Sequence, residues 1–348
     1  MRPSFMVGNI SIDKNVVPLV IPDIGINHEG SLSVAKKMVM SAHKAGARII
    51  KHQTHVIDDE MSKEARHTVP GNASVSIYEI MKRCALPEEE ELELMCFTKS
   101  LGMVFLSTPF SRAAADRLER FGVSAYKIGS GEMNNYPLVE HIASFGKPII
   151  LSTGMNNLTN VAKAVNILEK YGVDYALLHT TNLYPTSACL VRLGAMTELA
   201  AAFPGVPFGL SDHTINNNAC IAAIAQGASI VERHFVDTKK RNGPDVVCSM
   251  DETDLHELLC ATNEVHQMLG GHKESAYEER VTENFAFATV VSIKDIKRGE
   301  LLTKENIWVK RPGTGDIPAE EYNALIGRRV VVDIPLDTHL KHEMMDTI

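Results

Sequence analysis

The sequence predicts a (β/α)8 barrel, or TIM barrel, followed by a small β-rich domain. Eight short apolar runs alternate with helical segments, which is typical of a parallel sheet covered by helices. The eight units fill about 250 residues, the usual size of this barrel. The main alternative is an open doubly wound sheet, which often carries a Gly-rich nucleotide fingerprint after its first strand. Gly25-Ile-Asn-His-Glu-Gly30 does not match that fingerprint.

The elements follow one another in a regular order. Ser31 is a suitable N-cap for the first helix, and Glu88–Glu91 are expected to be a solvated helix N-terminus, favoured there by the helix dipole. The predicted strands cover residues 18–24, 48–53, 103–108, 125–128, 148–152, 175–180, 209–214 and 229–234. The predicted helices cover residues 31–45, 88–101, 111–121, 136–145, 157–171, 191–203, the small-residue segment before residue 229, and 252–269. Residues 54–87 are expected to form a polar excursion.

Four segments follow from these patterns. Residues 1–17 are expected to form a hairpin that caps the barrel, with a turn at Gly8-Asn9. The barrel covers residues 18–270, and the polar residues 271–284 form a linker. Residues 285–348 form the small domain, with strand-like runs at 288–292, 307–310 and 329–332. A domain of about sixty residues is near the lower limit of independent stability, so we expect it to pack on the barrel or on a partner subunit.

The composition excludes several classes of protein. A formal net charge of −8 over 348 residues argues against a nucleic-acid-binding protein. The six cysteines are scattered without a Cys-x-x-Cys pair, which indicates free thiols in a reducing compartment. The N-terminus shows no long apolar segment, so the sequence predicts neither a signal peptide nor a membrane span. We therefore expect a cytoplasmic protein with no membrane partner.

Polar side chains end all eight predicted strands, at the edge where barrel enzymes carry their catalytic groups. Lysines and hydroxyl groups there suit a phosphate and a carboxylate. His213 and His234 suit a divalent metal, although either histidine alone would more often be a core or loop residue. The candidate acid–base groups are Asp23, Glu132, Glu232 and Asp245. These residues predict a metal-assisted reaction between an anionic phosphate compound and a carbonyl compound.

Seven motifs together resemble the bacterial sialic acid (N-acetylneuraminate) synthase family. They are Asp23-Ile-Gly-Ile-Asn-His-Glu-Gly30, Lys51-His-Gln-Thr54, Ser107-Thr-Pro-Phe110, Lys127-Ile-Gly-Ser-Gly-Glu132, Ser152-Thr-Gly-Met155, Gly209-Leu-Ser-Asp-His-Thr214 and Glu232-Arg-His-Phe235. The tail, with Trp308-Val-Lys-Arg-Pro-Gly313, is similar to that family's antifreeze-like (SAF) domain, a small β-clip fold. The resemblance covers almost the whole chain and implies a transferase that condenses phosphoenolpyruvate with N-acetylmannosamine and releases phosphate.

The resemblance also implies roles for individual residues. His213 and His234 would hold the metal, most typically Mn²⁺, with Mg²⁺ or Co²⁺ as alternatives. Phosphoenolpyruvate would bind Lys51, Thr108, Lys127, Ser130, Ser152, Asn182 and Ser211, and the sugar would bind Gln53, Asn72, Tyr184, Asp245, Phe285 and Arg311. Asp23, Lys51, Lys127, Glu132 and Glu232 would be the catalytic residues. Arg311 would reach the partner's active site in a homodimer with swapped C-terminal domains.

One departure and three alternatives remain. The family pattern has Glu at the position of Asp23, so a contact of that carboxylate could become water-mediated. A sister synthase that makes legionaminic or pseudaminic acid from a 2,4-diacetamido sugar would share the chemistry. Schiff-base aldol chemistry at Lys127 or Lys51 would use a barrel lysine differently. A non-catalytic carbohydrate-binding protein would use the SAF-like domain as its binding module and keep the barrel only as a relic.

Overall fold

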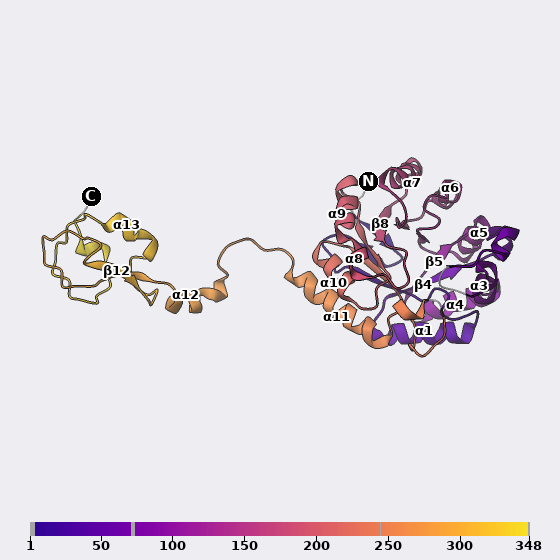
Figure 1. The fold of residues 1–348 in the computed structure, drawn as a ribbon, viewed down its shortest axis with the longest axis horizontal. Coiled ribbons are helices and arrows are strands. Elements are labelled where there is room, and N and C mark those ends of the chain that lie inside the picture. The colour runs from indigo at the N-terminus through magenta and orange to yellow at the C-terminus, as the bar shows by residue number, and fades with distance from the viewer. Residues whose placement is uncertain (1–3, 71–73, 244, 347–348) are drawn as a thin grey trace. The chain divides into compact units, whose positions relative to one another are not determined.

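The computed structural model describes residues 4–70, 74–243 and 245–346. The chain divides into two compact units, Met1–Gly270 and Gly271–Ile348 (Figure 1). Within the described residues, no helix is both long enough and apolar enough to cross a lipid bilayer.

The first unit is built on eight parallel strands that form a TIM-barrel-like sheet, as the sequence predicts. The hydrogen-bonded order is β5-β4-β3-β10-β9-β8-β7-β6. The end strands β5 and β6 lie in contact but share no ladder of hydrogen bonds in the described chain, so the barrel closes by packing at this seam. The strands are β3 (Leu19–Asp23), β4 (Ile49–Thr54), β5 (Val104–Pro109), β6 (Tyr126–Ile128), β7 (Ile149–Ser152), β8 (Tyr175–Thr180), β9 (Phe208–Asp212) and β10 (Ile230–His234).

Helices surround these strands and bury the outer face of the sheet (Figure 1). They are α1 (Leu32–Ala45), α4 (Glu88–Ser100), α5 (Arg112–Phe121), α6 (Tyr136–Ala143), α7 (Leu158–Tyr171), α8 (Ala188–Val191), α9 (Leu193–Ala202), α10 (Asn218–Ala225) and α11 (Glu252–Met268). The Ser31 side chain accepts a hydrogen bond from the Val34 amide, as its N-cap role requires. The helix predicted over 191–203 is α9, and the short α8 precedes it, separated from it by Arg192 in a left-handed conformation (φ 54°).

The N-terminal hairpin fills one end of the barrel. Its strands are β1 (Phe5–Val7) and β2 (Ile10–Ile12), joined at Gly8-Asn9. Phe5, Val7, Ile10 and Ile12 are buried and belong to the same apolar cluster as the inner side chains near the starts of the barrel strands. Water is therefore excluded from the lower half of the barrel interior, and the polar residues are confined to the upper half.

Alternation along each strand separates two sets of polar side chains, because successive residues face opposite sides of a sheet. Lys51 and Gln53 of β4 face the barrel interior, whereas His52 and Thr54 face the helices. Outside β9 and β10, the Arg233 guanidinium lies 3.1 Å from Asp212 Oδ2, with both side chains at most 2% exposed. Arg233 also donates to the Thr214 carbonyl and to Asn217 Oδ1, so this ion pair anchors the loop after β9.

Residues 54–91 add short helices to the expected polar excursion and correct one expectation. The excursion contains α2 (Ile57–Glu60), the 3-10 turn η1 (Lys63–Arg66) and α3 (Ile77–Cys84), the last begun by a capping box between Ser76 and Glu79. Glu91 is not solvated: it is 1% exposed and accepts hydrogen bonds from Thr54 and Arg117. It therefore links α4 to the outer face of β4.

The second unit has its own small apolar core. Its elements are the 3-10 turn η3 (Tyr277–Glu279), α12 (Arg280–Ala286), β11 (Thr289–Ser292), β12 (Ile307–Lys310), η4 (Ala319–Glu321), α13 (Tyr322–Leu325) and η5 (His342–Met344). The remaining 3-10 turn, η2 (Val246–Cys248), belongs to the first unit. The expected linker 271–284 thus includes most of a helix. The strand predicted at 329–332 is wrong, because Arg329 and Val330 make isolated bridges to two different partners, Leu301 and Met345, and no ladder develops.

Replacement of the buried guanidinium tests the Arg233–Asp212 pair. Arg233→Met leaves the Asp212 carboxylate buried without its cation, and breaking such a pair typically costs about 3–5 kcal/mol. We expect a matching fall in the free energy of unfolding, measured by urea denaturation of the full chain. Lys170→Met is the control, because Lys170 pairs with Glu140 on the surface, and it should leave the midpoint unchanged. Equal midpoints for the two variants would contradict the anchoring role.

Candidate active site

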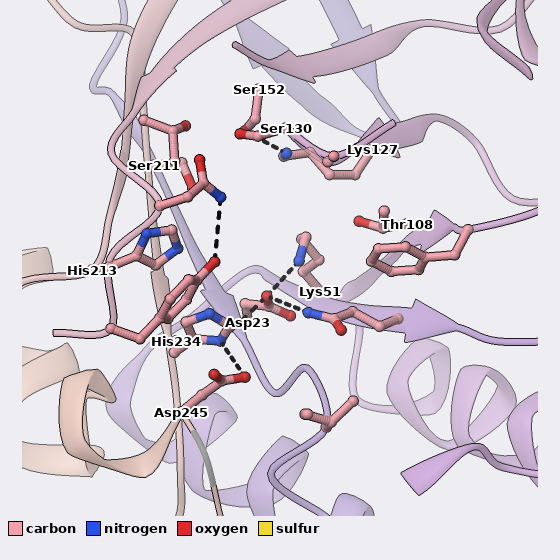
Figure 2. Close-up of a pocket in the computed structure, with 18 of the residues that line it drawn as sticks. Asp23, Lys51, Thr108, Lys127, Ser130, Ser152, Ser211, His213, His234 and Asp245 are labelled. Atoms are coloured by element: carbon pink, nitrogen blue, oxygen red, sulfur yellow. Dashed lines mark hydrogen bonds and ion pairs between the residues drawn. The ribbon is translucent and has the colours of Figure 1, made fainter. Parts of the chain in front are cut away.

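A cavity of about 320 Å³ opens at the carboxyl ends of the barrel strands. It is lined by nearly all of the barrel residues that the sequence predicts for the site, and Figure 2 shows how they are arranged. The predicted lining residues are Asp23, Lys51, Gln53, Thr108, Lys127, Ser130, Ser152, Asn182, Tyr184, Ser211, His213, Glu232, His234 and Asp245. The barrel therefore brings eight strand ends to one site.

Lysine and hydroxyl groups form one end of the cavity. Lys127 Nζ donates to Ser152 Oγ at 2.6 Å and to the Ile128 carbonyl at 3.0 Å. Ser130 Oγ accepts a hydrogen bond from the Gly154 amide. A Cβ on Gly154 would lie 1.9 Å from Asn182 Oδ1, so only glycine allows these loops to approach. The hydroxyl of Thr108 is buried without a partner among the described residues, which leaves it free for a ligand.

Two carboxylates and two lysines meet at the centre of the cavity. Lys51 contacts Asp23 in a close ion pair, and Glu232 lies 3.8 Å from Lys51 and 3.9 Å from Lys127. All four side chains are at most 7% exposed. Such buried charges persist only as pairs, because an isolated ion in this environment would be strongly destabilised.

The buried charges move the pKa values in different directions. Burial alone would raise the pKa of Asp23, but the charges of Lys51 and His234 and hydrogen bonds from Lys51 and Gly25 outweigh it and lower the pKa to about 2. Burial opposes the charge of Lys51 as well, yet Asp23 and Glu232 raise its pKa. Lys127 has no such close partner, and burial lowers its pKa to about 8. Asp23 and Lys51 are therefore charged at neutral pH, and Lys127 titrates just above it.

Histidines form the other end of the cavity, beside Asp245 (Figure 2). The His213 and His234 rings are stacked with centroids 5.4 Å apart, and Tyr184 lies 4.1 Å from His213. His234 Nδ1 lies 3.5 Å from Asp23 Oδ2 and 3.9 Å from Asp245 Oδ2. Burial lowers the pKa of His213 to about 3, so its imidazole is neutral.

This end of the cavity fits a divalent cation. His213 Nδ1 donates to the Thr181 carbonyl, which leaves Nε2 with its lone pair, and buried His234 Nδ1 has no hydrogen-bond partner among the described residues. Three lining carboxylates against two lysines give a formal charge of −1, which favours a cation. No group of three or more His, Cys, Asp or Glu side chains in the described chain is arranged as a metal site, so the two histidines would leave positions open for substrate or water.

Four predicted site residues are not among the described residues that line the cavity. Glu132 does not line the cavity; it accepts a hydrogen bond from Asn135, and burial raises its pKa. Because Glu132 does not line the cavity, its position does not support the catalytic role predicted for it. Asn72 lies outside the described residues. Phe285 and Arg311 belong to the second unit, where both are exposed.

The sequence reasoning missed one wall of the cavity. Ile26 and Pro70 line it together with Ile77, Ile80 and Met81 of α3, and Phe110 and Thr180 also contribute. The capping box at Ser76 and Glu79 was the available signal for α3. His28, which belongs to the first family motif, is buried, stacks on His52 and is not among the lining residues.

The pKa of Lys127 leads to a pH prediction. A phosphate monoester is already close to a dianion at pH 7, so deprotonation of Lys127 dominates above that pH. The pKa of Lys127 is about 8, so most of this amine loses its charge between pH 7 and pH 9. If only the charged amine binds the anion, we expect the Kd for phosphoenolpyruvate to rise up to about tenfold over this range. Isothermal titration calorimetry in buffers of different ionisation enthalpy should also detect proton uptake at pH 9. A Kd that stays constant with no proton uptake would contradict the assignment of Lys127 to the anion.

The comparisons with known proteins agree with this geometry. Residues 38–274 match the NeuB family, and residues 287–344 match the SAF domain. The chain is 35% identical to the N,N'-diacetyllegionaminic acid synthase of Campylobacter jejuni, over 89% of this chain and 95% of that protein. It is 27% identical to the human N-acetylneuraminate-9-phosphate synthase, over 94% of this chain and 92% of the relative.

A solved structure supports the same relationship. The N-acetylneuraminic acid (sialic acid) synthetase of Leptospira borgpetersenii superposes with a TM-score of 0.73 at 28% identity, over 80% of this chain and 94% of that one. Relatives named for an activity include synthases of sialic, legionaminic and pseudaminic acids and of a sialic acid phosphate. With its barrel and its tail both matched, this chain belongs to the NeuB family and carries a C-terminal SAF domain.

Proposed function

We propose that this chain is an N-acetylneuraminate synthase. It condenses phosphoenolpyruvate with N-acetylmannosamine, with a divalent metal, and releases phosphate by C–O cleavage. The observation that carries the proposal is the polarity of one cavity, with lysines and hydroxyls at one end and a histidine pair at the other. Family membership supports the reaction class.

The lysine end suits phosphoenolpyruvate. Lys127, Ser152 and Ser130 lie together and can donate to a phosphate, and the unpartnered hydroxyl of Thr108 adds a further donor. Lys51 lies at the centre, where it can hold the carboxylate while Asp23 keeps it charged. Ser211 donates to Glu232 at 3.2 Å, so this hydroxyl holds the Glu232 carboxylate in place between the two lysines.

The histidine end suits the sugar aldehyde. His213 and His234 would hold the metal, most typically Mn²⁺, which as a Lewis acid would polarise the aldehyde carbonyl. Gln53, Tyr184 and Asp245 lie around this end and can bind the sugar hydroxyls. Among the described residues, the lining of the cavity includes Lys51 and Lys127 but no arginine, which favours an acceptor sugar without a phosphate group of its own.

The reaction then follows from the placement of these groups. C3 of phosphoenolpyruvate attacks the aldehyde carbon, and positive charge develops at C2 between Glu232 and the lysines. Water adds to C2 and gives its proton to Glu232, which lies 3.8–3.9 Å from both lysines and accepts only the Ser211 hydroxyl. The tetrahedral intermediate expels phosphate, whose negative charge Lys127 stabilises.

The second candidate function is that of a sister synthase that uses a 2,4-diacetamido sugar. The observation that favours it is the 35% identity to a diacetyllegionaminic acid synthase. The apolar wall formed by Ile77, Ile80 and Met81 of α3 could contact an additional acyl group. Both candidates need the same histidine and lysine ends, so only the sugar distinguishes them.

Phosphate release tests the proposal directly. With Mn²⁺ and phosphoenolpyruvate, we expect phosphate release that depends on N-acetylmannosamine and is abolished by EDTA. Release only with a 2,4-diacetamido sugar would replace the first candidate by the second. Pyruvate and borohydride should leave no adduct on Lys51 or Lys127, and a trapped adduct with EDTA-resistant turnover would favour Schiff-base chemistry instead.

We further propose a homodimer in which Arg311 of one subunit completes the site of its partner. Exposed apolar side chains support such a contact on both units. Met155, Leu183, Ile215 and Val247 are exposed in loops that follow strands β7 to β10, and Phe285, Phe287 and Trp308 are exposed in the second unit. A small domain with this much exposed apolar surface is expected to bind another surface.

Coexpression of two inactive variants distinguishes a swapped from an unswapped site. His234→Ala disables the barrel and Arg311→Ala disables the arm. In a swapped dimer, random pairing gives mixed dimers in half of the molecules, with one intact site each, and restores about a quarter of wild-type phosphate release. Each variant alone is the control. No recovery in the mixed sample would show that Arg311 does not act across the dimer.

A further inference from the structure

The segment Thr181–Thr186 folds around the ring of His213. His213 Nδ1 lies 2.9 Å from the Thr181 carbonyl oxygen, which can only accept a hydrogen bond. Nδ1 therefore carries the proton, and Nε2 keeps the lone pair. In a neutral imidazole the partner of one nitrogen decides which nitrogen is free for a metal.

Thr186 contacts both the Thr181 carbonyl and the backbone of His213. Its side chain is buried, and its hydroxyl lies 3.1 Å from the Thr181 carbonyl oxygen and 2.7 Å from the Leu183 carbonyl oxygen. Its backbone amide donates to the His213 carbonyl at 2.9 Å. One residue thus ties together the carbonyl that orients the imidazole and the backbone that carries it.

The same segment positions two further cavity residues. The Tyr184 ring lies against the His213 ring, with centroids 4.1 Å apart and planes tilted by 37°, and Asn182 Nδ2 lies 3.5 Å from the Tyr184 hydroxyl. No helix or strand spans 181–187, between β8 and α8, so this loop is held by the Thr186 amide and by side-chain hydrogen bonds. The Thr181 hydroxyl does not bond within the segment Thr181–Thr186, because it donates to the Leu190 carbonyl.

We propose that Thr186 is a positioning residue for His213. Its hydroxyl holds the Thr181 carbonyl in place, and that carbonyl keeps His213 in the Nδ1–H tautomer with Nε2 available as a ligand. The consequence for a metal rests on the metal role proposed above for His213. The consequence for the tautomer rests on the hydrogen bonds alone. Thr186 touches neither substrate nor metal in this arrangement and acts only through the histidine.

Metal affinity provides the first test. Thr186→Val keeps the shape of the side chain and removes the hydroxyl, and loss of such an outer-shell partner typically weakens metal binding about 10–100-fold. We expect this increase in the Kd for Mn²⁺, measured by electron paramagnetic resonance without substrates. Thr186→Ser should restore an affinity near that of the wild type. Thr262→Val is the matched control, because Thr262 is also buried and donates to a backbone carbonyl, that of Leu258 on α11.

The tautomer provides a second test that needs no metal. In metal-free protein with ¹⁵N-labelled histidines, the His213 resonances are identified by their loss in His213→Gln. Wild type and Thr186→Ser should show protonated Nδ1, and Thr186→Val should show a mixture of tautomers. A folded Thr186→Val with the wild-type tautomer and wild-type Kd for Mn²⁺ would overturn the proposal. A changed tautomer in a protein whose wild type does not bind Mn²⁺ would support the positioning role and refute the metal assignment.

Discussion

Four buried charges at the centre of the barrel constrain how the strands of the first unit are arranged. Asp23, Lys51, Glu232 and Lys127 project from four strands into an interior that solvent barely reaches. None of them could remain ionised there alone, because desolvation of a single charge costs more than any one contact returns. The strands must therefore place each of them within 4 Å of an oppositely charged partner. The N-terminal hairpin contributes by filling the opposite end of the barrel and keeping the interior below them apolar.

The outer face of the same strands carries a second set of polar contacts. Glu91 accepts hydrogen bonds from Thr54 and Arg117 behind β4, and Arg233 pairs with Asp212 behind β10. These contacts lie one residue away from Gln53, Ser211 and His234, which face the cavity. A register shift of one residue would exchange the two sets, so each set helps to fix the other.

The sequence was sufficient for the barrel and for most of its site. Strand ends such as Lys51, Lys127 and His234 could be identified because parallel strands deliver their carboxyl ends to one edge. The direction of individual side chains at those ends was harder. Asp212 and His179 are also polar residues at strand ends, yet alternation turns both toward the helices, where Asp212 pairs with Arg233 and His179 contacts the Val191 carbonyl. Glu132 follows the end of β6, but the turn before α6 directs it to Asn135. A run of glutamates at a helix start suggests that all of them are solvated, but Glu91 is buried. The sequence does not reveal this, because its partner Arg117 lies on α5, far along the chain.

The seam between β5 and β6 affects the shape of the lysine end of the cavity. Elsewhere in the sheet, ladders of hydrogen bonds hold neighbouring backbones at the fixed spacing of about 4.8 Å. Thr108 is on β5 and Lys127 is on β6, so the two strands that carry these donors are not joined by a ladder. Side-chain packing therefore sets the width of the cavity between them, and space is limited there, since a Cβ placed on Gly129 would lie 3.7 Å from Thr108 Cγ2. A change in the size of a residue at this seam would alter the width of the barrel without breaking a ladder of backbone hydrogen bonds between β5 and β6.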